Sequence, residues 1–363
     1  MAALFADIKT PYINEATLKR IMANRVKENI FQGIFTRPGE AVTEKFSNDT
    51  DAAQIQVIRV KPNNKQAREL GADTNGAWFN GTGASTPTTE AYPINIITTI
   101  DDVIDIPTNQ QDMMNVDVAE AELSNLAGRV NKNVNAITFA TQLAKNFNTF
   151  TSVSNNWVTL DASNPDYLAA IIEAGAKLDD GNEAQGIDAY PDDERAIFIR
   201  SGAKASLMKK GQIIIGGSNA AQTILRKGGL DENVDPEVAT TGYLGEVDGM
   251  PVYMASKAVW TLAEKYLGLT AGALNDVEML VVSGIGTGRA LAFNAAIKMI
   301  DSPNGQGRRI QPKYRFGANC WDEYSVVPVV KSTFTKPSGT LTVMAPGSRT
   351  TDAGSDAGID TGD

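Results

Sequence analysis

Residues 115–148 read NVDVAEAELSNLAGRVNKNVNAITFATQLAKNFN, and this stretch decides how the rest of the chain is interpreted. Asn115 is a suitable N-cap, and acidic residues in the early turns precede basic residues in the later ones, as the helix dipole favours. At about 1.5 Å per residue the stretch predicts one α-helix about 50 Å long, which suggests a building block more than a catalyst. Its one-face residues recur every three or four positions: Val116, Ala119, Leu123, Leu126, Val130, Val134, Ile137, Thr141 and Ala144.

The composition excludes several classes of protein. The 363 residues give ample length for a core, and no window approaches the roughly 20 apolar residues that a membrane span needs. A net charge of −10 argues against tight nucleic-acid binding, which requires clustered lysine and arginine. The N-terminal segment lacks the apolar core of a secretory signal, and the single cysteine, Cys320, excludes an intrachain disulfide.

The residues that usually carry catalysis are sparse. Histidine is absent, which removes Ser-His-Asp and Cys-His catalysis and the usual zinc sites. The run GIGTG at 284–288 follows a predicted strand, but Arg289 stands where the dinucleotide fingerprint needs its third glycine. We therefore predict a glycine-rich turn there, with no cofactor.

The remaining candidates for chemistry have ordinary structural readings. Acidic groups at 101–102, 179–180 and 192–194 lack the alternating spacing of a calcium loop, so they predict solvated caps. Cys320 has no basic neighbour in sequence to activate it, which predicts a buried or interface thiol. We expect no catalytic, cofactor-binding or metal-binding residues, and no enzyme.

The first hundred residues predict an arm followed by a long two-stranded loop. Residues 1–50 read as an arm with an amphipathic helix over 15–30, either a surface helix or one that packs on a neighbouring subunit. Strand 54–60 is expected to pair with 94–106, and the long polar connection between them is improbable unless it is functional. Trp78 and Phe79 lie in that connection, and we expect them to anchor on another copy of the chain, with packing on their own domain as the alternative.

The second half alternates short apolar strands with helices and glycine-rich turns. Two antiparallel strands are expected near the end, at 308–316 and 323–330, around a turn at 317–322, and a turn is expected at Asp248-Gly249. A helix starting at Asn164-Pro165-Asp166 and ending before Gly181 is predicted. Further elements are predicted as helix 201–210 and strands 196–199, 251–255 and 279–283.

The tail, residues 337–363, has too little apolar surface to fold alone. Leu341, Val343 and Met344 form its only sizeable apolar run. We expect this run to add as a strand to a neighbouring subunit, because the side chains of 340–344 alternate and favour β-structure. The corresponding expectation is that deleting 337–363 leaves the subunit's fold intact.

The order of arm, long hairpin, long helix and mixed α/β half resembles the tailed-bacteriophage major capsid protein family, which has the Hong Kong ninety-seven-type fold. The stretch GEVDGMPVYMAS at 245–256 looks like the family's strand segment entering the apical domain's sheet. The stretch 290–330, with Arg308, Arg309 and Arg315, looks like its closing strands. The resemblance covers about residues 1–335 and rests on segment order and loose patterns.

The resemblance implies an α+β fold and a shell subunit without catalytic residues. It implies hexamers and pentamers that close an icosahedral virion shell around a double-stranded DNA phage genome, with no sequence-specific DNA binding and no membrane. Assembly in the host cytoplasm, a portal, minor capsid proteins and a separate scaffolding protein are also implied. The implied parts are an N-terminal arm at 1–50, an extended loop at 51–107, a peripheral domain at 108–189 and 301–335 with its spine helix at 115–148, an apical domain at 190–300 and a tail at 336–363.

Three alternatives remain open at the level of the sequence. An encapsulin-like bacterial compartment shell would have the same fold and enclose enzymes instead of DNA. A phage tail-tube or surface protein would also be structural. A histidine-free α/β enzyme would use carboxylates, lysine or tyrosine.

Overall fold

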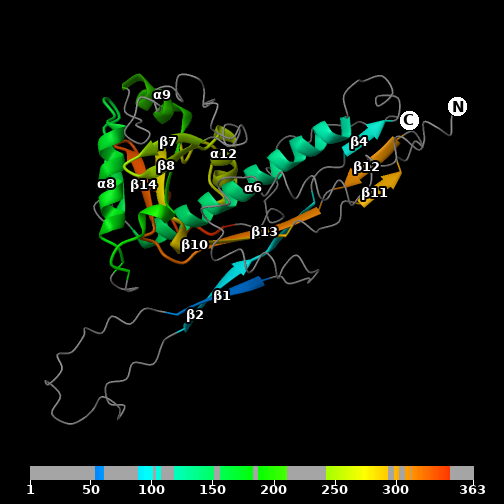
Figure 1. Cartoon of the computed structure of the whole chain (residues 1–363), viewed down its shortest axis with the longest axis horizontal. Helices are drawn as coiled ribbons and strands as arrows, with labels where there is room; N and C mark the ends of the chain where they lie inside the picture. The colour runs from blue at the N-terminus through cyan, green and yellow to red at the C-terminus, as the bar shows by residue number, and fades with distance from the viewer. Residues whose placement is uncertain are drawn as a thin grey trace, which may run out of the picture.

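A long helix, α6, crosses much of the described molecule and confirms the central prediction from the sequence (Figure 1). It spans Val118–Thr149, and residues 134–144 are buried on every side. None of the helices in the described ranges is both long and apolar enough to cross a membrane. The computed structural model describes residues 54–60, 89–100, 104–107, 118–150, 156–182, 187–210, 243–292, 298–301, 307–311 and 313–343.

The larger body is built on a six-stranded mixed sheet in the order β5-β14-β9-β6-β8-β7. The pairs β5–β14 and β6–β8 are parallel, and the other neighbours are antiparallel. The three strands predicted at 196–199, 251–255 and 279–283 are confirmed as strands, and the structure places them side by side in this sheet. The strands are β5 Val158–Leu160, β6 Arg195–Ile199, β7 Tyr243–Val247, β8 Met250–Met254, β9 Val277–Ser283 and β14 Val326–Lys331.

Helices cover both faces of this sheet. Helices α8 (Tyr167–Asp179) and α9 (Ser201–Lys210) pack on one face, and α6 and α12 (Lys257–Tyr266) pack on the other. Strand β6 shows the alternation that this requires, because Ala196 and Phe198 join the α6 side while Ile197 and Ile199 join the α8 side. Because both faces are covered, β6 is buried along its whole length, and its residues after Arg195 are all apolar.

Local signals set several element ends. Asp166 caps α8 by accepting the backbone N–H of Ala169, so the helix begins after Asp166 and Pro165 is not its first residue. Gly181 follows the helix at φ +66°, as predicted from its position. Asp248 (φ 54°) and Gly249 (φ 75°) form the turn between β7 and β8, which confirms the turn predicted there.

Three smaller sheets lie beside and beyond α6 (Figure 1). One has the order β10-β13-β3, the second β11-β12-β4, and the third is the β1–β2 ribbon. Two short 3₁₀ turns, η3 (Asp192–Glu194) and η4 (Gly284–Gly286), precede β6 and β10. The strands are β1 Gln54–Val60, β2 Thr89–Asn95, β3 Ile97–Ile100, β4 Ile104–Pro107, β10 Thr287–Ala292, β11 Lys298–Asp301, β12 Gly307–Gln311 and β13 Lys313–Cys320.

Two expected strand pairings are wrong. Strand β1 pairs with β2 over its whole length, and the β-branched segment after Asn95 instead supplies β3 and β4, which pair with β13 and β12. Strands β13 and β14 are not a hairpin, because β13 pairs with β10 and β3 while β14 pairs with β9 and β5. Strand propensity identifies extended segments, whereas packing of the whole chain selects their partners.

The division of the chain into peripheral and apical domains stays a prediction. Strand pairing crosses the expected boundaries at two places: β5 and β14 join the sheet that also holds β6, β8 and β9, and β10 and β11 pair with β13 and β12. The expected arm at 1–50, with its helix at 15–30, and the tail beyond residue 343 lie outside the described residues.

Candidate functional site

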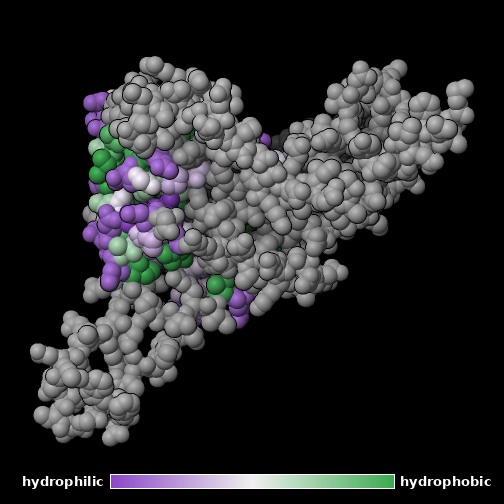
Figure 2. All heavy atoms as spheres, in the orientation of Figure 1, coloured by the Kyte–Doolittle hydropathy of each residue, from purple (hydrophilic) through white to green (hydrophobic). Residues whose placement is uncertain are grey.

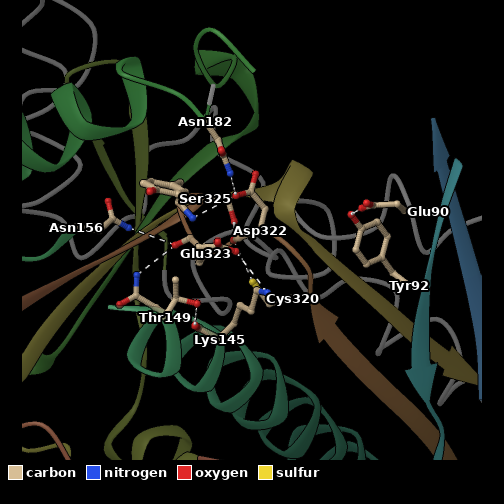
Figure 3. A network of polar contacts seen from close by, with 12 residues as sticks. Glu90, Tyr92, Lys145, Thr149, Asn156, Asn182, Cys320, Asp322, Glu323 and Ser325 are labelled. Atoms are coloured by element: carbon tan, nitrogen blue, oxygen red, sulfur yellow. Dashed lines mark hydrogen bonds and ion pairs between the residues drawn. The ribbon is translucent and has the colours of Figure 1, made fainter. Parts of the chain in front are cut away.

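The chain passes from the smaller sheets to the larger one through residues 321–325, which we call the junction. Asp322 is its centre and is fully buried. Tyr190 donates its hydroxyl to Asp322 Oδ2 at 2.6 Å, and the Asn182 side-chain amide donates to Oδ1 at 2.9 Å. The backbone N–H of Tyr324 also reaches Oδ1, at 3.2 Å. Figure 3 shows Asn182 directed at Asp322. A buried carboxylate that accepts three hydrogen bonds is held in place, because the loss of any one of them would leave part of its negative charge uncompensated.

The end of α6 is fastened to the same junction. Asn146 and Asn156 each donate to the carbonyl oxygen of Val326, at 2.7 and 2.9 Å, and each also reaches the Glu323 carbonyl at 3.2 Å. Trp157 donates its indole N–H to the Asn146 side-chain oxygen at 2.6 Å. Lys145 pairs with the Glu323 carboxylate at 3.4 Å. The side-chain amides of Asn146 and Asn156 thus act as hydrogen-bond partners of the backbone, in place of a neighbouring strand, where the chain enters β14.

The glycine-rich run after β9 is explained by this junction. A side chain at Gly286 would overlap the Ser325 hydroxyl, and the backbone of Gly286 accepts the N–H of Trp321 at 3.0 Å. Ser283 in turn donates its backbone N–H to the Ser325 carbonyl at 2.8 Å. The prediction of a glycine-rich turn is confirmed, and the absence of a side chain at Gly286 makes room for the side chain of Ser325.

Burial explains the state of the lone thiol. Cys320 is buried and donates weakly to the Asp322 carbonyl at 3.4 Å, which confirms the predicted buried thiol. Burial raises the pKa of Cys320 to about 12, so the thiol stays protonated near neutral pH and is a poor nucleophile. Burial, together with the neighbouring Asp322 carboxylate, also raises the pKa of Tyr190.

Two of the acidic residues serve as ion-pair partners of Arg195. Arg195 binds Asp179 at 2.7 Å and Asp192 at 3.1 Å, so two of the acidic groups meet at one guanidinium. Among the described residues, no group of three or more cysteine, aspartate and glutamate side chains is arranged to hold a metal ion. The pair at 101–102 lies outside the described residues.

The C-terminal strap, residues 332–343, runs back over the end of α6. The Asn148 side chain accepts the Leu341 N–H at 2.8 Å and donates to the Leu341 carbonyl at 2.7 Å. Phe334 packs against Phe147 and Trp157, with ring centroids 5.5 and 5.7 Å apart. The side chain of Leu341 is only 6% exposed and belongs to the core of its own subunit.

The structure therefore gives different outcomes for the contact residues that the sequence suggested. Leu341 is buried in the core of its own subunit. The sequence had led us to expect that a neighbouring subunit would bury it. Val343 packs on the same core and is only partly buried. Trp78, Phe79 and Met344 lie outside the described residues, and their contacts stay a prediction.

Sequence reasoning missed the junction because no motif signals it. The partners of Asp322 come from residues 182 and 190, and those of the Val326 carbonyl come from 146 and 156, all distant in the sequence. A network of this kind becomes visible only when the elements are placed together.

Comparison with known proteins identifies the fold. No protein-family model matches the chain, and no curated protein matches it. The capsid of Ralstonia phage GP4 is similar in structure, with a TM-score of 0.50 and 8% identity over 81% of this chain and 87% of that chain. Mycobacterium phage Bobi gives a TM-score of 0.47 at 13% identity over 81% and 91%, and the capsid of Cyanophage P-SCSP1u gives 0.44 at 12% over 78% and 85%.

The likeness to the GP4 capsid is the one that carries the assignment, and it extends over most of both chains. The chain has an α+β capsid fold, built of the long helix, the helix-covered sheet and the strand ribbon described above. The fold implied by the sequence resemblance is thereby confirmed.

Proposed function

We propose that the chain is a major capsid protein, the structural subunit of the icosahedral shell of a tailed bacteriophage. The observation that carries this proposal is the fold shared with the GP4 capsid over most of both chains. The function is mechanical: copies of the chain join into hexamers and pentamers, which close around double-stranded DNA. The proposal assigns no catalytic residue, and the location is the virion, after assembly in the host cytoplasm.

The net charge of −10 fits a container better than a DNA-binding protein. An acidic subunit does not neutralise phosphates, so DNA is enclosed without sequence-specific contacts. We include a separate scaffolding protein, a portal and minor capsid proteins among the partners, as the family resemblance implies.

The subunit mass gives a direct test of self-assembly. We expect mass photometry of the concentrated full chain to detect species at five and six times its 38.7 kDa mass. A chain that stays monomeric at every concentration would contradict the proposal. Extraction of nucleic acid from native particles then distinguishes a virus from an enzyme-filled compartment, because only the virus encloses a DNA genome.

We propose that subunit contacts involve Trp78 and Phe79 in the loop, Val343 at the end of the strap, and Met344 directly after it. Large aromatics often anchor interfaces because they bury much apolar area at little cost in conformational freedom. Replacing both Trp78 and Phe79 with Ala should remove the five- and six-copy species and leave thermal unfolding of the monomer unchanged. A large loss of monomer stability would assign the two aromatics to the core instead.

A further inference from the structure

One side of helix α8 carries apolar side chains that its own chain leaves exposed. Ala169, Ile172 and Ala176 are exposed and recur at intervals of three and four residues, so they lie together on one side of the helix. Glu173 is exposed beside them. One large exposed apolar side chain does not by itself mark an interface, so the surrounding charges decide how this face is interpreted.

Negative charge dominates the exposed part of this face. The exposed charged side chains of α8 are both acidic, Glu173 and Asp179, and Asp180 is exposed directly after the helix. Two basic side chains lie near them. Lys177 is half-buried, and Arg195, which binds Asp179, is buried. We call the surface formed by Ala169, Ile172, Glu173, Ala176 and Asp180 the acidic face.

Helix α12 presents the opposite charge. Its two exposed charged side chains are Lys257 and Lys265, whereas its one acidic residue, Glu264, is buried and accepts two backbone N–H groups. Ala258 is exposed, and Leu262, about one turn further along, is half-buried. The exposed side of α12 is therefore a short apolar strip with a lysine near each end. We call Lys257, Ala258, Leu262 and Lys265 the basic face.

The acidic and basic faces lie on opposite sides of the six-stranded sheet. Helix α8 packs with Ile197 and Ile199 on one side of β6, and α12 packs with Ala196 and Phe198 on the other (Figure 1). The sheet separates the two faces, so they do not meet within one copy. A closed ring of identical copies needs two different surfaces on each copy, one for the copy before it and one for the copy after it.

We propose that the acidic face of one copy binds the basic face of the next copy around a ring. The proposal rests on the shell function proposed above, which requires rings of copies. The partner is a second copy because this chain itself carries the surface of complementary charge. Burial of Ile172 against the strip of Ala258 and Leu262 supplies apolar contact. The charges select the α12 face over a second α8 face, because two acidic surfaces repel each other.

Exchange of one charge pair tests this contact. Glu173→Lys and Lys265→Glu should each raise the concentration at which half of the chains are in rings by about tenfold or more, measured by sedimentation velocity at low salt. The double variant exchanges the two charges and keeps the net charge of the parent, so it should return to within about threefold of the parent value. Thermal unfolding of the three monomers should be unchanged, because both positions are exposed.

Glu246→Lys is the matched control for the change in net charge. Glu246 is a half-buried residue of β7, at the opposite edge of the sheet from β5, β14 and β9, on which α8 packs. This variant should form rings at the same concentration as the parent. Weakening equal to that of Glu173→Lys would assign the effect to net charge and would overturn the specific contact.

Crosslinking of two variants locates the contact directly. Ala176→Cys on α8 and Ala258→Cys on α12 place thiols at exposed positions, while the native Cys320 is buried. A short bifunctional maleimide should join the two variants to each other when they are mixed under ring-forming conditions. Crosslinks only between like chains would show that each helix meets its own copy, which would overturn the proposal.

Failure of the contact and failure of the proposed function give different results. If the parent forms rings and neither charge reversal weakens them, or the exchange does not restore them, the contact between the acidic and basic faces is wrong and the shell function stands. A parent chain that forms no rings at any concentration would overturn both.

Discussion

Buried polar side chains gather where β13 leads into β14, and they determine the path of the chain there. Asp322 receives two side-chain donors and one backbone donor, while Asn146 and Asn156 cap the carbonyls that follow. Each group is costly to bury alone and stable only with its partners. The network thus specifies one direction for the chain as it enters β14.

Asp322→Ala should lower the free energy of unfolding by roughly 3 kcal/mol or more, because it leaves the buried Tyr190 hydroxyl and Asn182 amide without their acceptor. Tyr190→Phe should cost about 1.5–3 kcal/mol, since it removes one hydrogen bond to a charged group. Urea unfolding measures both values. Asp188→Ala, at an exposed position, is the control. A loss of less than about 1 kcal/mol in Asp322→Ala would contradict the role given to the junction.

The raised pKa of Cys320 predicts that the stability of the protein depends on pH in the alkaline range. Its pKa is raised from 9.0 to about 12, so the folded state holds the thiol proton more tightly than the unfolded state does. The resulting stabilisation is complete below pH 9 and is lost as pH rises toward 12. The free energy of unfolding should therefore fall by up to about 1.4 kcal/mol per pH unit in this window.

Cys320→Ala isolates this effect, because other groups with raised pKa values, such as Tyr190, remain in both proteins. The stability difference between parent and variant should shrink by about 2 kcal/mol between about pH 8 and about pH 10.5. Urea titrations at the two pH values measure it. A difference that does not change with pH would mean that the thiol is accessible to solvent in the folded state.

At the scale of elements, the strap completes the core next to α6. Leu341 is buried against its own subunit, and Asn148 binds both of its backbone polar groups. The expectation that deleting 337–363 leaves the subunit's fold intact is therefore revised. A chain ending after Val343 should unfold like the full chain. A chain ending after Lys336 should lose about 2–5 kcal/mol, the usual cost of deleting a large buried apolar side chain. Equal urea midpoints for the two truncations would show that Leu341 contributes little.

Elements with strong periodicity or clear end signals were predictable from the sequence. The long helix, α9, β1 and the central strands β6, β8 and β9 lie where the pattern indicated. Strand β2 was not predicted, because TEAYPIN contains a proline and two charged or amide side chains in seven residues. Its extended form depends on pairing with β1 and on support from Trp321.

Strand partners and the junction could not be predicted, because both depend on contacts between distant residues. Asp322 and Asn182 are separated by 140 positions, and no local pattern links them. Of the contact residues proposed from the sequence, Leu341 was recognised as apolar and important, but its partner is its own core. Apolar character predicts that a side chain is buried, and it leaves open which subunit buries it.

At the scale of the whole molecule, the described surface offers few large apolar side chains. Ile172 on α8, 51% exposed, is the one large hydrophobic residue that is exposed among the side chains whose burial the structure describes. Figure 2 shows polar and apolar residues side by side on the face around α8. Single exposed residues of this kind are ordinary on protein surfaces.

The central claim is that copies of this chain close into a shell, and electron microscopy of the concentrated full chain tests it most directly. The account predicts curved or closed particles built of rings with fivefold and sixfold symmetry. Straight tubes would assign the chain to a tail-like structure instead, and small discrete particles at every concentration would contradict a shell function altogether.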